Sequence, residues 1–237
     1  MSASIKAGLN NDMHLMTDGV TRAYVDGNGK VGIGTSSPGR DLHINGTSVN
    51  SKAFTRYTHD GLASNGLDVG YSSGGYASIY NAENTAMVFS TNASERMRID
   101  ASGYVTKPNQ PGFNVRFNTN NSTSPTGIDT VKFNQIVTNI GSHYSTSTGR
   151  FTAPVSGFYQ FNLSIYFQNG TNYVGSMLVR SDGTVYYNFS SVGPDVMVYT
   201  SQAVYLNQND YMYTRTYCGG NTTTLRQYSY FSGHLIG

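Results

Sequence analysis

The sequence predicts an all-β fold, and three observations lead to that prediction. Only 12% of residues are charged and glutamate occurs only at Glu83 and Glu95, so residues that favour helices are scarce. Nineteen Tyr and eleven Phe supply the apolar surface of a core. Gly and Asn turn signals separate short runs in which apolar and polar residues alternate. With 237 residues, the chain can form one large or two small domains without cross-links.

An internal repeat organises the N-terminal half. Residues 13–31 align without gaps on residues 87–105, at an offset of 74 residues. Each copy predicts a strand, a polar turn, a second strand, an Asp-x-x-Gly turn and a third strand. Units this thin cannot bury a face alone, and they become stable by stacking or by wrapping with other chains. We therefore expect residues 1–106 to form a β-rich shaft that contains two related repeats.

The pattern of apolar and polar residues changes in the second half of the chain. Residues 107–112 predict a linker, because two prolines and a glycine interrupt the pattern. From residue 113 to residue 237, longer alternating runs predict the strands of a sandwich, at 113–117, 158–167, 173–180, 184–189, 196–206, 211–217 and 228–236. One buried sheet face is expected to carry Phe151, Phe158, Phe161, Ile165 and Phe167.

Two segments of the first half resemble a known family. Residues 32–46, GIGTSSPGRDLHING, and residues 89–103, FSTNASERMRIDASG, are similar to the repeats of phage tail-fibre shafts. This resemblance implies that the first half belongs to a fibre.

A second resemblance covers residues 113–237. The segment resembles the globular head of the complement first-component q subunit, a relative of tumour necrosis factor, through residues at the spacing of its signature: Phe133, Asn139, Tyr144, Phe151, Gly157, Tyr159 and Phe161. Residues 148–161 and 231–236 fit the central and last strands of that family. Leu163 departs from the pattern, because the family usually has Phe or Tyr there. The resemblance implies a homotrimer of ten-stranded jelly-roll heads that bind ligands and are not enzymes.

The two resemblances together lead to an expected function. We expect a trimeric fibre or appendage protein of a phage-like particle, made in the host cytoplasm and localised to the virion. Its N-terminal region would contact other particle proteins, and its head would bind a host cell-surface receptor, a glycan or a protein. A structural or decoration fibre without receptor binding, a polysaccharide depolymerase and an exported adhesin remain as alternatives.

Composition argues against nucleic-acid partners and membrane insertion. The formal charge is +2 and the Lys and Arg residues are scattered, so no basic stripe is present. No apolar run approaches the roughly 20 residues of a spanning helix. Residues 1–11 lack the charged and apolar regions of a signal peptide. Cys218 is the single cysteine, which excludes a disulfide within one chain and predicts a structural thiol near a strand end.

Short motifs of cofactor and metal sites occur without the context that those sites need. Residues 27–32 match G-x-G-x-x-G, but the following residues cannot begin the helix of a dinucleotide site. The Asp26 turn lacks the closing Glu of a calcium loop, and residues 70–74 match G-x-S-x-G without a strand-to-helix elbow. We expect no cofactor and no metal site, because ligand spacing is absent among His14, His43, His59, His143 and His234.

Carboxylates in the head bear on the depolymerase alternative. A glycosidase needs two carboxyl groups roughly 5 to 9.5 Å apart. The acids of the head each occur in a turn-like context and are expected in separate turns: Asp129, Asp182, Asp195 and Asp210. We therefore expect no catalytic residue.

The loops of the head predict a ligand site. If the last strand runs from the apex to the base of the head, where the shaft joins, reversal at each turn places residues 168–172, 191–196 and 218–224 together at the apex. Their amide and aromatic side chains suit the hydroxyls and C–H faces of sugars. The predicted binding residues are Gln168, Asn169, Asn172, Tyr173, Asp195, Tyr199, Tyr217, Asn221 and Thr222.

Overall fold

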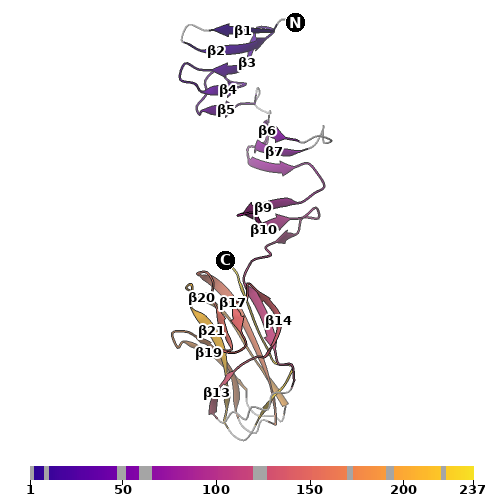
Figure 1. Cartoon of the computed structure of the whole chain (residues 1–237), viewed down its shortest axis with the longest axis vertical. Coiled ribbons are helices and arrows are strands. Elements are labelled where there is room, and N and C mark those ends of the chain that lie inside the picture. Colours follow the sequence, from indigo (N-terminus) through magenta and orange to yellow (C-terminus); the bar gives the residue numbers. More distant parts are fainter. Residues whose placement is uncertain are drawn as a thin grey trace. The chain divides into compact units, whose positions relative to one another are not determined.

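The computed structural model describes residues 3–7, 11–46, 52–58, 66–119, 127–169, 173–190, 195–219 and 223–237. Every regular element within these ranges is a β-strand (Figure 1). The predicted all-β fold class is therefore confirmed. Two compact units divide the chain, Met1–Thr106 and Lys107–Gly237. We call them the N-terminal unit and the head.

Three small sheets make up the described part of the N-terminal unit. The first has five strands, β1 (Ala3–Ala7), β2 (Met13–Thr17), β3 (Val20–Val25), β4 (Val31–Ile33) and β5 (Leu42–Ile44). Its neighbours are antiparallel except for the parallel pair β4–β5. The other two sheets have three strands each, β6 (Ala53–Tyr57), β7 (Leu67–Tyr71) and β8 (Ala77–Asn81), then β9 (Met87–Thr91), β10 (Ser94–Ile99) and β11 (Val105–Thr106).

The two sequence repeats adopt the same strand register. Pairing of β2 with β3 and pairing of β9 with β10 match residue for residue at the offset of 74, and each has one register shift. The shift falls at an arginine in both copies. In each copy that arginine donates from Nε to a threonine Oγ1 at 2.8 Å, Arg22 to Thr17 and Arg96 to Thr91. The same local hydrogen bond therefore accompanies both bulges.

The Asp-x-x-Gly turns are also built alike in the two copies. Asp26 Oδ1 accepts the backbone N–H groups of residues 28 and 30, at 2.9 and 2.8 Å. Asp100 Oδ1 accepts those of residues 102 and 104, both at 2.9 Å. Gly29 and Gly103 close the turns at φ of +87° and +88°, a conformation that favours glycine. In each copy the aspartate side chain thus fixes the turn by accepting two backbone N–H groups.

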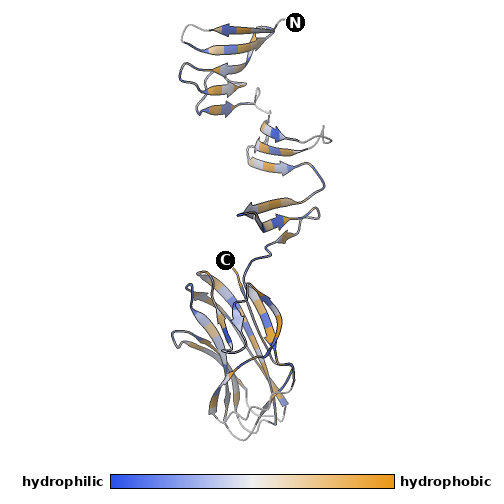
Figure 2. Ribbon diagram, viewed as in Figure 1, coloured by the Kyte–Doolittle hydropathy of each residue, from blue (hydrophilic) through white to orange (hydrophobic). Residues whose placement is uncertain are grey.

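Apart from Pro38, the apolar side chains in the described part of the N-terminal unit are not buried. In its described residues only Gly32, Pro38, Gly66 and Asp68 are buried, and Asp68 is paired with Arg56 at 2.6 Å. Figure 2 shows apolar residues along strands that no second layer of the unit covers. A thin sheet without a covered face is marginally stable in water at best. These faces therefore need a cover from outside the unit.

Two six-stranded sheets form the head. The strands are β12 (Gly112–Arg116), β13 (Gly127–Val131), β14 (Gln135–Ile140), β15 (Tyr144–Ser145), β16 (Arg150–Thr152), β17 (Gly157–Gln168), β18 (Val174–Arg180), β19 (Val185–Ser190), β20 (Asp195–Leu206), β21 (Tyr211–Cys218), β22 (Thr224–Leu225) and β23 (Tyr230–Leu235). The first sheet has the order β14-β12-β23-β17-β20 with β22 beside β17, and the second has the order β15-β16-β21-β18-β19 with β13 beside β21. This is a jelly roll whose two-residue strands β15 and β22 add to the ten expected strands.

Aromatic rings fill the space between the sheets. The ring of Phe113 stacks on those of Tyr144 and Phe151, with centroids 5.3 and 4.8 Å apart, and meets Phe231 edge-on at 4.8 Å. Strand β17 contributes every second side chain to this core, namely Tyr159, Phe161, Leu163, Ile165 and Phe167. Leu163, the one departure from the signature, is buried like its neighbours.

One predicted core residue is on the wrong face. Phe158 was predicted to lie with the buried residues, but its side chain is 53% exposed. Its neighbour Tyr159 is fully buried, and consecutive residues of a strand point to opposite faces. The Phe158 ring instead lies edge-on to Tyr205 on the outer face of the first sheet, with centroids 5.3 Å apart. The burial of Phe151, Phe161, Ile165 and Phe167 is confirmed.

An asparagine ties the first sheet to the second. The side chain of Asn139 in β14 donates from Nδ2 to the Tyr144 carbonyl at 2.9 Å and accepts the Tyr144 N–H at Oδ1, at 3.0 Å. Gly141 and Ser142 turn the chain between them with positive φ. The amide side chain thus satisfies both backbone groups of a buried residue, which a hydrocarbon side chain could not do.

Phe161→Ala is expected to lower the free energy of unfolding by about 3 to 5 kcal/mol, because a fully buried ring is lost and a cavity remains. Phe158→Ala is the matched control and should cost less than about 1 kcal/mol within one chain, because half of its ring already faces water. Urea unfolding at low chain concentration, where contacts between chains contribute least, measures both. Equal effects would contradict the assignment of the two faces.

Candidate functional site

Several predicted binding residues lie at one end of the head. Gln168 ends β17 and stands directly opposite Asp195, the first residue of β20. On its other side Gln168 pairs with Thr224 of β22. The second sheet reaches the same end, because Val174 of β18 pairs with Ser190 and Cys218 there. We call this region the strand-end site.

Aromatic residues border the strand-end site. Tyr173 immediately precedes β18, and its carbonyl accepts the Gly219 N–H at 2.9 Å. The ring of Tyr217 meets that of Phe189 edge-on, with centroids 5.7 Å apart and planes at 90°. Tyr173 is exposed and Tyr217 is half-buried, so both present aromatic surface to solvent. Phe189 was not among the predicted site residues.

The remaining predicted residues fall into three groups. Asn169 is exposed and has φ of +59°, and it directly follows β17. Tyr199 lies four residues inside β20, on its outer face, where its hydroxyl contacts the Met197 sulfur. It therefore belongs to the sheet surface rather than to the strand ends. Predictions for Asn172, Asn221 and Thr222 lie outside the described residues.

Two further tyrosines accompany Asp195. Tyr166 of β17 and Tyr228 meet edge-on, with ring centroids 6.0 Å apart. Burial raises the pKa of Tyr166, and a hydrogen bond with the Asp195 carboxylate raises it further. The raised pKa keeps the Tyr166 hydroxyl protonated beside the Asp195 side chain. Sequence reasoning missed both tyrosines, although the parity of β17 puts Tyr166 on the same face as Gln168.

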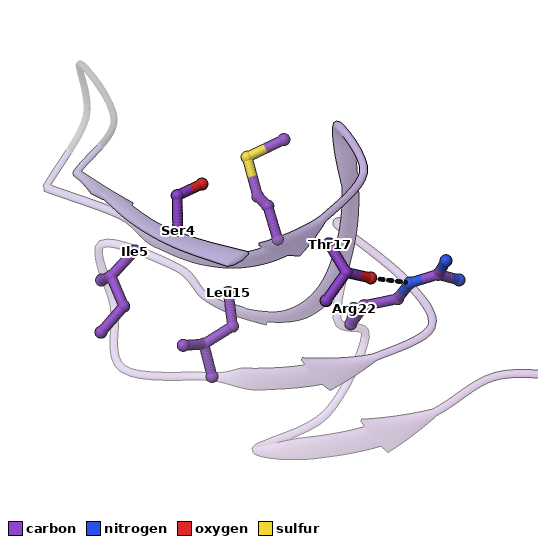
Figure 3. A pocket seen from close by; sticks show the side chains of 6 residues that line it. Ser4, Ile5, Leu15, Thr17 and Arg22 are labelled. Atoms are coloured by element: carbon purple, nitrogen blue, oxygen red, sulfur yellow. Dashed lines mark hydrogen bonds between the residues drawn. The ribbon is translucent and has the colours of Figure 1, made fainter. Parts of the chain in front are cut away.

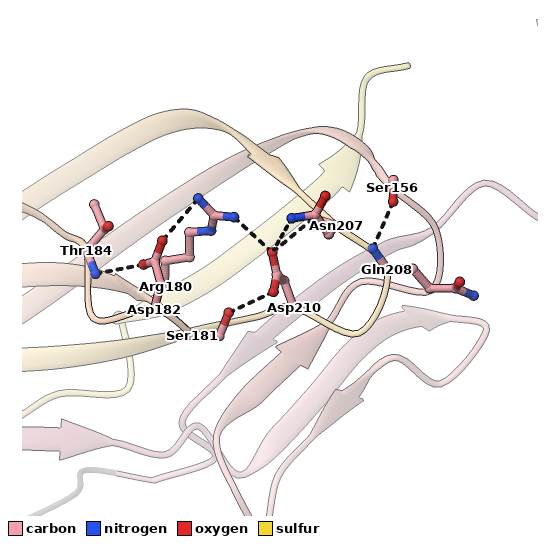
Figure 4. A network of polar contacts seen from close by, with 8 residues as sticks. All are labelled: Ser156, Arg180, Ser181, Asp182, Thr184, Asn207, Gln208 and Asp210. Atoms are coloured by element: carbon pink, nitrogen blue, oxygen red, sulfur yellow. Dashed lines mark hydrogen bonds and ion pairs between the residues drawn. The ribbon is translucent and has the colours of Figure 1, made fainter.

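A second polar cluster contains two of the head's acids (Figure 4). Arg180 is paired through Nη2 with Asp210 Oδ2 at 2.9 Å and through Nη1 with Asp182 Oδ2 at 3.2 Å. The Ser181 hydroxyl donates to Asp210 Oδ1 at 3.2 Å, and the Asn207 N–H donates to Asp210 Oδ2 at 3.0 Å. Asp182 and Asp210 do lie in separate turns, as expected, but Arg180 links the β18–β19 turn to the β20–β21 turn.

The acids of this cluster are both ionised at neutral pH. The hydrogen bond from Arg180 lowers the pKa of Asp210, and the backbone N–H of Thr184 lowers the pKa of Asp182. A glycosidase needs one carboxyl group that keeps its proton near neutral pH. This pair therefore joins turns and supplies no general acid. Asp129, the remaining acid, lies within β13 rather than in the expected turn.

The described ranges show no metal cluster and no membrane-spanning helix. They contain no group of three or more His, Cys, Asp or Glu side chains placed to hold a metal ion. They also contain no helix long and apolar enough to cross a membrane. Cys218 is buried at the end of β21, and burial raises the pKa of its thiol, so the protonated form is favoured.

Comparison with known proteins gives the same fold for the head. Residues 112–236, more than half of the chain, match the C1q domain family. Complement C1q tumor necrosis factor-related protein 3 of Mus musculus and that of Homo sapiens are each 29% identical over 106 residues, which cover 44% of this chain. The aligned residues span 43% of the length of each relative.

Two solved structures are similar to about half of this chain. The globular domain of zebrafish complement 1qA protein has a TM-score of 0.44 at 19% identity and covers 54% of this chain and 98% of that one. Murine APRIL at pH 5.0 has a TM-score of 0.44 at 14% identity and covers 54% of this chain and 99% of that one.

Asp210→Asn is expected to destabilise the head at neutral pH and to have little effect in acid. The folded-state pKa of Asp210 lies below its unfolded value, so the ionised group favours the folded state above the unfolded pKa. That contribution is lost as the pH falls through the folded pKa. Urea unfolding at about pH 7 and about pH 2.5 brackets this window.

The matched control for this comparison is Asp129→Asn, which removes an exposed carboxylate outside the ion pairs of the described residues. It should change stability little at either pH. A destabilisation by Asp210→Asn that stayed the same in acid would assign the loss to packing instead of charge.

Proposed function

The chain belongs to the C1q domain family, whose domains typically trimerise and are typically non-catalytic, and on this premise we propose that it is a homotrimeric fibre or appendage protein of a phage-like particle. Its head would bind a receptor on a host cell surface, with a glycan as the favoured ligand. The N-terminal region would contact other proteins of the particle, and the protein would be localised to the virion.

The exposed apolar faces of the N-terminal unit are the observation that carries the proposal. Ile5 and Leu15 are cross-strand partners on β1 and β2, and they are 71% and 44% exposed (Figure 3). Val69 and Ile79 form a similar exposed pair on β7 and β8. Contiguous apolar surface of this kind marks contact with another chain. Three copies around one axis would supply the cover that each sheet lacks.

The head has a comparable surface. The outer face of β17 and β20 exposes the edge-on pair Phe158 and Tyr205, and Tyr199 lies farther along β20 with 54% of its surface exposed. Interfaces are enriched in Tyr and Phe, and burial between chains would remove these rings from water. This face is therefore our candidate for the contact between heads.

The fibre assignment is supported by the repeats. Two copies with the same register, bulge and aspartate turn form a periodic unit, and periodic thin units are typical of elongated assemblies. The resemblance of residues 32–46 and 89–103 to tail-fibre shafts supports the assignment to a phage-like particle. A structural fibre would explain these features equally well. Receptor binding is favoured by the strand-end site, where Gln168, Asp195 and two tyrosines combine polar and aromatic groups.

The full chain is expected to sediment as a trimer at micromolar concentration. Phe158→Ala together with Tyr205→Ala should shift the equilibrium towards monomer, because two rings of the proposed contact are lost. Ile128→Ala, an exposed apolar residue of the second sheet, is the control and should leave the trimer intact. Analytical ultracentrifugation over a range of concentrations measures the association. A wild-type chain that sediments as a monomer at micromolar concentration would contradict the proposal.

Ligand binding at the strand-end site can be tested on an array of immobilised glycans. Combined Ala substitutions at Tyr173, Asp195 and Tyr217 should abolish binding to the glycans that the wild-type trimer recognises, while sedimentation stays unchanged. Ala substitutions at Asp41 and Tyr76 remove the same residue types from the N-terminal unit and should have no effect. Unchanged glycan binding by the triple variant would contradict the strand-end site and move the binding site elsewhere on the chain, whereas a wild-type trimer that binds no glycan would favour a structural fibre.

A further inference from the structure

A cationic groove lies on the outer face of the second sheet. Its lining includes Lys132, Arg150 and Arg215 together with the ring of Tyr213. Side chains of β21 alternate along the strand, with Met212, Thr214 and Thr216 buried and the residues between them half-exposed. Tyr213 and Arg215 therefore face away from the core. None of these residues belongs to the strand-end site.

Strand register brings the two arginines together. Arg150 of β16 is the direct partner of Tyr213 on β21. Arg215 lies two residues farther along β21 on the same face and is opposite Thr130 of β13. Arg150 and Arg215 are thus diagonal neighbours, about 7 to 8 Å apart at the backbone, which long side chains can bridge. Both guanidinium groups can reach one ligand.

A tight turn places Lys132 near the two arginines. Lys132 directly follows β13, and Gly149 directly precedes Arg150. Gly149 has φ of +71°, and a Cβ atom there would lie 3.0 Å from the Val131 carbonyl oxygen and 3.1 Å from Lys132 Cγ. Only glycine lets the turn approach this closely without displacement. Lys132 is therefore held beside the strand that carries Arg150.

Aromatic rings, not carboxylates, hold the two guanidinium groups. Arg150 Cζ lies 4.1 Å from the centroid of the Tyr211 ring, and Arg215 Cζ lies 5.2 Å from that of Tyr213. Among the described residues, neither arginine forms an ion pair, and Lys132 forms none. Cation–π contact restrains a guanidinium without cancelling its charge or using all of its N–H donors. The positive charge stays available to an anion.

We propose that this groove binds the acidic groups of a polysaccharide, carboxylates or sulfates. A guanidinium fork matches both groups with paired hydrogen bonds. Hydroxyl groups of Thr130, Ser147 and Thr148 line the same groove and can bond the neighbouring sugar hydroxyls. Three cations in one short groove suit a few acidic groups rather than the long phosphate row of nucleic acid. The site goes beyond the proposed function, since it needs neither the strand-end site nor the trimer.

Isothermal titration calorimetry of the full chain tests the site with defined probes at low salt. Polygalacturonate carries carboxylates, dextran sulfate carries sulfates, and unmodified dextran carries neither. The wild-type protein is expected to bind one or both acidic polymers and not dextran. Arg150→Gln with Arg215→Gln should weaken that binding at least tenfold. The control, Arg40→Gln with Arg116→Gln, removes the same charge from exposed positions elsewhere and should stay within twofold.

A second variant distinguishes loss of the groove's charge from misfolding of the double variant. Thr148→Glu adds a carboxylate to an exposed turn of the groove and leaves both cation–π contacts in place, and it should also weaken binding at least tenfold. The proposal is overturned if the wild-type protein binds neither acidic polymer, if the control pair loses as much as the groove pair, or if dextran binds equally well. Tighter binding of a short DNA duplex, lost in the groove pair, would assign the groove to nucleic acid instead. Sedimentation and strand-end variants are read separately, so either proposal can fail alone.

Discussion

The alternation of side chains along a β-strand constrains this whole chain, because one face of every sheet must be kept from water. In the head, the second sheet covers the first, and the ring of Phe113 contacts Tyr144, Phe151 and Phe231 between them. In the described N-terminal unit no second layer exists, and the Ile5–Leu15 pair stays exposed. One constraint thus explains both a well-packed domain and a unit whose apolar faces stay exposed.

Arginine shows how surroundings decide the role of one residue type. Arg180 is enclosed by two carboxylates, so its charge joins two turns and little of it remains for a ligand. Arg150 and Arg215 lie against tyrosine rings, which restrain their guanidinium groups and leave the charge uncancelled. The first arrangement is structural, and the second leaves donors that an anion can use. Counting charges in the sequence does not separate these cases.

Much of the fold could be predicted from the sequence because period-2 patterns act locally. The all-β class and the buried face of β17 follow from composition and from the parity of Phe161, Ile165 and Phe167. The prediction for Phe158 was wrong because the residue is aromatic like the core residues. Its position in the alternation, however, puts it on the face opposite to that of Tyr159, and this signal is present in the sequence. Strand β14 was missed for the converse reason. Its consecutive Ile136 and Val137 are both exposed, so the strand has no buried alternation to detect.

The sites were harder to predict, because they depend on pairing between distant strands. Counting reversals leads to loops at one end, and the structure pairs Gln168 with Asp195 there, yet turn counting does not indicate that Tyr166 contacts Asp195. The groove could not be predicted from the sequence for the same reason. Arg150 and Arg215 become neighbours only through the register of β16 on β21, and a shift by one residue would turn Tyr213 and Arg215 into the core. Buried Met212 and Thr214 hold that register, so packing inside the head determines which charges meet outside it.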